Sequence, residues 1–266
     1  MAVTSMRSSS IRDYNRRNGM RVPSISVSGG TETDITVGAD TYRVHTFTSS
    51  DTMSIVTGGV IEYLVVAGGG GGGCQTSSNN RGGGGGGAGG LLTGALQVES
   101  GNYTITVGAG GQGFGTYNTV GTQGGNSSIG TEVVATGGGF GGSSDNSPAS
   151  GGSGGGGGHT GGASGISGQG FAGGNGGSGG STTGGSGGGS GGAGNGQVSS
   201  SSVAIGGLGT TTAFNGTSYL YASGGDSWLG NSTPTVRNKY GDGGNSTVGG
   251  TGGTAQDGIV IVRYKV

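Results

Sequence analysis

The sequence has little of what most folded proteins use to build and stabilise a core. Hydrophobic residues make up 28% of the chain and charged residues 9%, and there are three prolines and one cysteine. The single cysteine, Cys74, excludes an internal disulfide framework. The scarcity of charge separates the chain from disordered proteins of the highly charged type. Without an apolar run of about 18 residues, no membrane insertion is expected.

Residue patterns for catalysis are also missing, and we expect no enzyme, cofactor or metal site. There is no HExxH or CxxC pattern. His45 falls in an alternating strand-like stretch, which favours a packing role, and His159 follows five glycines, which would hold a catalytic base poorly. GxGxxG patterns recur, but none follows a strand and opens a helix, as a dinucleotide site requires. The net charge of −1 gives no case for nucleic-acid binding.

Glycine is what the sequence has in excess. The chain contains 78 glycines in 266 residues, without the period-three glycine pattern and high proline content of collagen. Ordering glycine costs more backbone entropy than ordering any other residue. Such a chain is therefore either disordered or recovers the cost through dense backbone hydrogen bonding, at a net ~0.5–1.5 kcal/mol per bond.

Conventional strand patterns lie at the two ends of the glycine-rich part. Alternating β-branched and aromatic residues predict strands over residues 41–48, 52–56 and 60–66, and later over 102–107 and 258–264. The unbroken run Leu64–Ala67 predicts a strand that is buried on both faces. The C-terminal strand is expected to return to the early strands, which gives a mostly β fold with a small antiparallel sheet or sandwich closed by the C-terminal strand.

Residues 68–257 form a glycine body for which two structures compete. A flexible glycine–serine linker is one. The other is an ordered bundle of polyglycine-II-like helices with three residues per turn, in which Gly-Gly-X repeats such as residues 173–181 turn X outward. We favour the bundle, because a linker would not run to this length or carry scattered large apolar residues. Those residues are Phe114, Phe140, Phe171, Leu208 and Trp228, and strand-like islands occur at 131–136, 203–205, 218–222 and 235–239.

The N-terminal segment differs in charge from the rest. Residues 1–21 carry a local charge of +4 on a chain whose remainder is about −5. We therefore predict an anchoring arm in residues 1–40, before a glycine-rich β domain in residues 41–266, and an acidic partner for it. Arginine suits such a groove because its planar fork pairs with carboxylates in a bidentate way. The candidate anchoring residues are Arg7, Arg12, Tyr14, Arg16, Arg17 and Arg21.

Large aromatic residues are the other candidate site. Aromatic side chains at the tips of glycine-rich loops would contact sugars or a protein on a host surface. Alternatively, they cap the polyglycine bundle and pack on one another. These residues are Phe140, Phe171, Tyr219, Tyr221, Trp228 and Tyr240.

Several segments in order resemble a glycine-rich domain found in tail fibres and other virion surface proteins of phages, especially marine and cyanobacterial ones. The segments are Val44–Ser49, Val60–Gly70, Thr106–Gly111, Gly124–Gly130 and Asp257–Tyr264. The resemblance covers about residues 41–264 and includes non-glycine strands. It implies a virion component with a role in receptor contact, and related adhesin tips stack polyglycine helices in layers. The long attachment domain and coiled shaft of many tail fibres are missing here.

From this resemblance we expect a phage structural protein on the virion exterior, made in the host cytoplasm. The first expectation is a short tail fibre or tail-tip adhesin that contacts the host. A capsid decoration or head-fibre protein, held by its N-terminal arm, is the second. A bacterial glycine-rich surface protein is the third, and the lack of a secretory signal argues against it. Expected partners are tail or capsid proteins, a host receptor and the chain itself, as a homotrimer that covers exposed strand edges.

Overall fold

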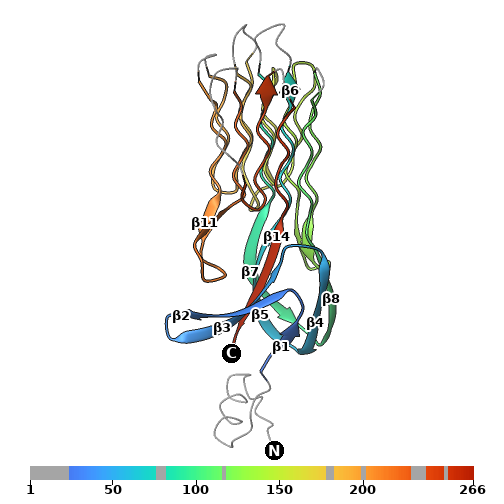
Figure 1. Ribbon diagram of the computed structural model, residues 1–266, viewed down its shortest axis with the longest axis vertical. Coiled ribbons are helices and arrows are strands. Elements are labelled where there is room, and N and C mark those ends of the chain that lie inside the picture. Colours follow the sequence, from blue (N-terminus) through green and yellow to red (C-terminus); the bar gives the residue numbers. More distant parts are fainter. Residues whose placement is uncertain are drawn as a thin grey trace, which may run out of the picture.

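The computed structural model describes residues 24–75, 82–115, 118–177, 183–198, 202–228, 238–248 and 251–266. These residues form strands and extended segments, with no helix among them. Figure 1 shows an elongated molecule with a β-sandwich at one end and a bundle of extended segments running to the opposite end. We call the bundle the glycine body, and its end farthest from the sandwich, where β6 (Cys74–Gln75) and β13 (Thr247–Val248) lie, the distal end.

The sandwich consists of two five-stranded antiparallel sheets. The first has the order β1-β4-β8-β9-β10 and the second β2-β3-β14-β5-β7. The first sheet contains β1 (Ser26–Ser28), β4 (Asp51–Thr57), β8 (Gly101–Thr106), β9 (Ser127–Ile129) and β10 (Val133–Ala135). The second contains β2 (Thr31–Val37), β3 (Asp40–Phe47), β14 (Ile259–Lys265), β5 (Gly59–Val66) and β7 (Leu91–Val98). A small hairpin joins β11 (Thr210–Thr212) to β12 (Tyr219–Tyr221).

The centre of the second sheet is buried on both faces. One face packs against the first sheet through Val65, Val260 and Val262, opposite Met53 and Ile105. The other face carries Val44, Leu64 and Ile261 and is covered by Tyr221 of the β11–β12 hairpin. The run Leu64–Ala67 has no exposed surface, which confirms the prediction that this strand is covered on both sides.

The C-terminal strand lies in the middle of the second sheet. β14 pairs with β3 through Val260 opposite Phe47, and with β5 through Val260 opposite Val65. The last strand of the chain thus joins strands that are formed about 200 residues earlier in the sequence, and the closed, mostly β fold is confirmed.

Several strands were not predicted from the sequence. β7 lies within residues 68–257, which were predicted to form the glycine body. Gly94 interrupts its alternation, and the ring of Tyr63 lies over that glycine, where a Cβ would be 2.6 Å from the Tyr63 hydroxyl oxygen. β1 and β2 also belong to the sheets, so the folded unit begins before the predicted boundary at residue 41. Of the strand-like islands, β10 and β12 are strands, and Ala204 makes an isolated bridge to Ser227.

The glycine body is held together by lateral hydrogen bonds with a period of three residues. In the segment 67–74, the amides of residues 67, 70 and 73 donate to segment 82–90. Those of 68, 71 and 74 donate to segment 119–126, and those of 69 and 72 donate to segment 252–258. The donor–acceptor distances are 2.8–3.0 Å. A repeat of three residues per turn with bonds only to neighbours is the geometry of polyglycine II, as predicted.

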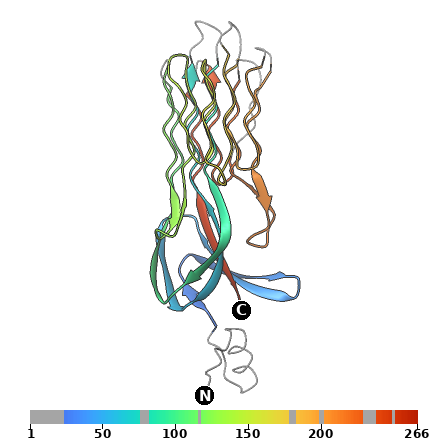
Figure 2. The ribbon, with the colours of Figure 1, turned by 180° about the vertical axis from the view of Figure 1, so that it is seen from behind.

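Each central segment is surrounded by six others. Segment 67–74 also accepts hydrogen bonds from residues 111, 138, 141 and 244, which lie on three further segments. The bonds arrange these segments in three stacked layers. Figures 1 and 2 show from opposite sides that the segments run along the length of the body. The middle layer runs through 108–115, 67–74, 82–90, 183–190 and 192–198; the flanking layers are 119–126, 136–143, 151–158 and 170–177 on one side, and 252–258, 241–246, 222–228 and 204–209 on the other.

The sandwich sets the register of the body. Val66 pairs with Leu91 in the second sheet. The same antiparallel register continues beyond the sheet, because Ala67 bonds to Gly90, Gly70 to Gly87 and Gly73 to Gly84. A β-hairpin therefore changes into two polyglycine segments that remain paired at every third residue.

Side-chain oxygens replace peptide carbonyls at several points of the array. Asp242 accepts from the Ser223 amide and Asn245 from the Asp226 amide, both at 2.8 Å. Asp226 in turn accepts from the Gly206 amide at 2.8 Å. Asp242 and Asn245 lie three residues apart, as do the donating residues Ser223 and Asp226. The two bonds therefore follow the turn of the polyglycine helix. Asp226 and Asp242 are buried, and their main-chain hydrogen bonds explain how the array accommodates these carboxyl groups.

Replacing Gly70 by alanine should unfold the body. A Cβ at Gly70 would lie 2.2 Å from the carbonyl oxygen of Gly139, and a main-chain atom held in the array cannot move aside. We expect a loss of at least about 3 kcal/mol in the free energy of unfolding, the upper end of overpacking costs. The matched control is Gly161→Ala, whose Cβ would meet nothing nearer than 3.6 Å. Urea unfolding that gave both variants the same stability would contradict the packing described here.

Candidate interaction surfaces

Two residues of types that often take part in catalysis or metal binding, His45 and Cys74, are buried in this structure. His45 has no exposed surface; its Nδ1–H donates to the Gly29 carbonyl oxygen at 2.8 Å, and its ring stacks on Tyr264 at 5.9 Å. Cys74 is also buried. The described residues contain no cluster of three or more His, Cys, Asp or Glu that would hold a metal ion. In the same residues, no helix has the length and apolarity needed to cross a bilayer.

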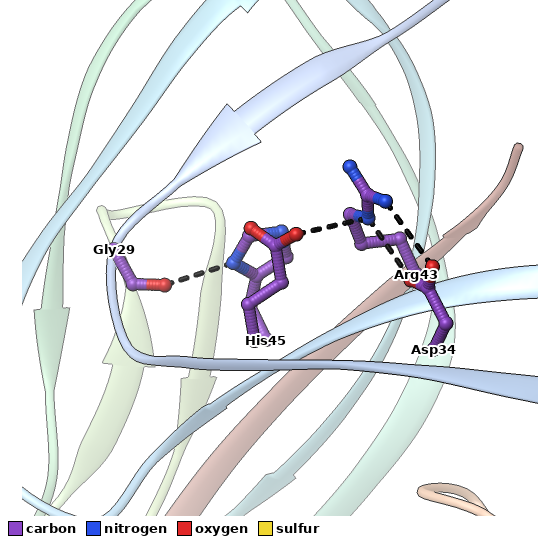
Figure 3. A network of polar contacts seen from close by, with 5 residues as sticks. Gly29, Asp34, Arg43 and His45 are labelled. Carbon is purple, nitrogen blue, oxygen red and sulfur yellow. Dashed lines mark hydrogen bonds and ion pairs between the residues drawn. The ribbon is translucent and has the colours of Figure 1, made fainter.

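A charged cluster lies on the β2–β3 hairpin beside His45 (Figure 3). The Arg43 guanidinium donates to both carboxylate oxygens of Asp34, at 3.0 and 3.2 Å, and lies 3.0 Å from a carboxylate oxygen of Glu32. The hydrogen bond from Arg43 holds the pKa of Asp34 below its usual value. Because all three side chains are well exposed, these ion pairs contribute little to the stability of the fold.

Three of the six candidate aromatic residues form one cluster at the base of the glycine body. Tyr219 lies 5.4 Å from Tyr221 and 6.2 Å from Tyr240 between ring centroids. Tyr221 is 1% exposed, so it offers no surface to a partner, and here packing is the correct interpretation. Tyr219 and Tyr240 are half-buried and line a groove of about 450 Å³ with Asn238, Thr254, Ala255, Gln256 and Asp257.

The other three candidate aromatic residues lie apart. Phe140 is half-buried on segment 136–143, and its carbonyl oxygen accepts from the Ala149 amide. Trp228 is half-buried towards the distal end, where its amide lies 3.4 Å from the Ser246 hydroxyl. Phe171 is 49% exposed. The structure therefore does not gather the six residues into one surface.

Arginine contacts fix the β11–β12 hairpin to the second sheet. The Arg263 guanidinium lies between the rings of Phe214 and Tyr42, at 4.3 and 5.0 Å from their centroids. It donates to Glu62 at 2.7 Å and to the Phe214 carbonyl oxygen at 3.0 Å. A partly buried cation held by two rings and a carboxylate contributes more than an exposed ion pair. The candidate anchoring residues Arg7, Arg12, Tyr14, Arg16, Arg17 and Arg21 lie outside the described residues.

Turns at the distal end are tied to each other by side chains. Asn146 donates to the Asn118 carbonyl oxygen at 3.1 Å, and the amide of Asp145 donates to the Asn118 side chain at 3.2 Å. The Asn118 side chain donates in turn to the Asp145 carboxylate. These bonds join the turns before segment 119–126 and after segment 136–143, so the array presents them in a fixed arrangement.

A groove not indicated by the sequence lies where β7 enters the sandwich. It has a volume of about 690 Å³ and is walled by Leu91, Leu92 and Thr93 on one side and by the turn 164–172 on the other. Phe171 is one of the residues that line this groove, and none of the lining residues is charged. No sequence pattern indicated the groove, because its two walls lie far apart in the sequence and one of them is a turn rich in serine and glycine.

Comparison with known proteins places most of the chain in one family. The model of a glycine-rich domain matches residues 45–265. The match begins in β3 and ends in β14, the two strands that pair in the second sheet, so it spans the glycine body and most of the sandwich. No curated protein matches the chain.

The buried position of Tyr221 gives a prediction for alkaline pH. Burial raises the pKa of Tyr221 from 10.0 to about 12. Below about pH 10 the hydroxyl is protonated in both states and has no effect on stability. Between these two pH values the unfolded chain loses the proton first, so the free energy of unfolding should fall as pH rises. Urea unfolding over this range should show a shallower fall in Tyr221→Phe than in the unsubstituted protein; equal slopes in the two proteins would refute the prediction.

Proposed function

The chain belongs to the glycine-rich domain family, and on this basis we propose that it is a structural protein on the exterior of a phage particle. Its role is that of a short tail fibre or tail-tip adhesin, with the sandwich towards the particle and the distal end towards the host. The observation that supports this most is the hydrogen-bonded array, which separates a sandwich that receives the N-terminal segment from a distal end made of turns.

Stiffness supports a fibre role. Eight residues of polyglycine-II geometry cover about 25 Å at a rise of ~3.1 Å per residue. Over this length, each amide of the segment 67–74 is bonded to one of three neighbours. Bending the body would break bonds in several layers together. A part that holds turns away from a surface needs this property, and it needs no reactive pocket.

The N-terminal end supports the orientation. β1 lies in the first sheet, at the end of the molecule opposite the distal turns, so the residues before Ser24 join the molecule at the sandwich. The arginines at positions 7, 12, 16, 17 and 21 belong to this N-terminal segment, and in the proposed role they bind an acidic groove on a tail or capsid protein. Host contact falls to the distal turns and to exposed aromatic residues, and the protein carries out no catalysis in this role.

Removing residues 1–21 tests the anchoring role. We expect the truncated protein to remain folded, because every described strand lies beyond residue 25, and to be missing from purified particles. Arg12→Glu with Arg16→Glu and Arg17→Glu in the full chain should have the same effect, since charge reversal removes the pairing with carboxylates. Particles are purified and probed with an antibody to the body.

The control for this experiment is Asp145→Lys, a charge reversal at a turn of the distal end, away from the sandwich, that should leave incorporation unchanged. Normal incorporation of the truncated protein would overturn the anchoring role. The number of copies per particle separates two locations. A number that follows the symmetry of the tail supports the fibre, and one that follows the shell would instead identify a capsid decoration or head-fibre protein.

A further inference from the structure

The outer edge of β7 differs from the other three sheet edges of the sandwich. β1 and β10, the edges of the first sheet, have three residues each. β2, one edge of the second sheet, carries Glu32 and Asp34. Short strands and charged residues both prevent unwanted pairing at an edge. β7 has eight residues and no charge or proline, so it is the long unprotected edge among the described strands.

The hydrogen bonds show which groups of β7 point outward. Ala67 donates to Gly90 across the hairpin, and Leu91 donates away from it, to the Gln169 carbonyl oxygen. In an antiparallel pair such groups alternate. The amides and carbonyls of Thr93, Ala95 and Gln97 therefore point away from β5, and these three residues are exposed without a backbone partner in the described structure.

The groove of about 690 Å³ continues this edge towards the glycine body. Phe171, Leu91 and Leu92 give it an apolar wall, and serine hydroxyls surround them. An extended segment that adds to a sheet edge gains main-chain hydrogen bonds, and a pocket beside the edge selects its side chains. Because neither β7 nor the groove carries a charge, the fitting segment is uncharged and has an apolar side chain.

One segment of the chain outside the described residues has this character. Ala2-Val3-Thr4-Ser5-Met6 is uncharged and contains two β-branched residues and a methionine, whereas Arg7–Arg21 is rich in charge. We propose that the edge of β7 binds residues Ala2–Met6 of a neighbouring copy of this chain. The 17 residues from Arg7 to Pro23 reach about 55 Å when extended, which is enough to cross to a neighbour.

Pairing of β7 with β7 of a second copy fits less well. Two identical strands that join antiparallel about a twofold axis run in opposite directions. β7 runs away from the glycine body, so the two distal ends would then point apart (Figure 1). Exchange of N-terminal segments imposes no such reversal, so all distal ends can lie on one side, and it leaves the arginines of each arm available to another partner.

Cross-linking in the full chain tests the exchange. Thr4→Cys is combined with Ala95→Cys, and the protein is treated with a short bis-maleimide; Cys74 is buried and does not react in the folded state. We expect covalent dimers and larger species on a denaturing gel. The matched control, Thr4→Cys with Thr36→Cys on β2, should stay monomeric, as should Thr4→Cys alone. Covalent monomers with an internal link, or no link at all, would overturn the proposal.

A second variant tests the edge without added cysteines. Ala95→Pro removes an amide that points away from β5, so the sandwich keeps its own hydrogen bonds. Light scattering should show that the variant and a chain lacking residues 2–6 lose the same self-association, while thermal unfolding confirms that both remain folded. Self-association that survives either change contradicts the proposal. Both readouts concern self-association only, so their failure leaves the proposed role on the phage particle unaffected.

Discussion

The structure depends on one interaction, the lateral hydrogen bond between peptide groups of neighbouring extended segments. Fixing one residue costs roughly 1–2 kcal/mol of backbone entropy, and glycine lies at the costly end. One hydrogen bond returns a net ~0.5–1.5 kcal/mol, so a single pair of segments would not be stable. A segment with six neighbours satisfies its donors and acceptors on every side. The array is therefore cooperative, and at positions such as Gly70 it leaves no space for a methyl group.

The sandwich supports this array by fixing the position of the segments that adjoin its strands. Hydrophobic packing orders β5, β7, β8, β9, β10 and β14, and each of them leads directly into a segment of the body or follows one. The register of β5 and β7 passes into segments 67–74 and 82–90 without a shift. Glycine segments have no side chains to select a register, so the strands at their ends supply it. This division explains why the chain has a small apolar core at one end only.

Inside this array, buried polar side chains are hydrogen-bonded to main-chain groups, and the surfaces that a partner can reach lie at its borders. Asp226 and Asp242 are buried among main-chain amides, and His45 donates to a main-chain carbonyl, so these groups serve the structure. In the role that we propose, recognition would fall to the turns at the distal end, to half-buried tyrosines at the base and to the uncharged edge of β7. A stiff body with interaction surfaces at both ends fits a part that connects two larger objects.

Residue patterns in the sequence determined the class of the fold. Alternation predicted β3, β4, β5, β8 and β14, and the glycine content required main chains that bond to one another. Only the tertiary structure decided which segments are neighbours, because glycine carries no side chain to mark a partner, and this choice buried Tyr221 while it left Phe171 exposed. The same is true of β7, whose alternating pattern is interrupted by Gly94. The ring that covers this glycine belongs to Tyr63 on the neighbouring strand β5. Contacts between distant residues, which one-dimensional patterns do not contain, formed the groove beside this strand.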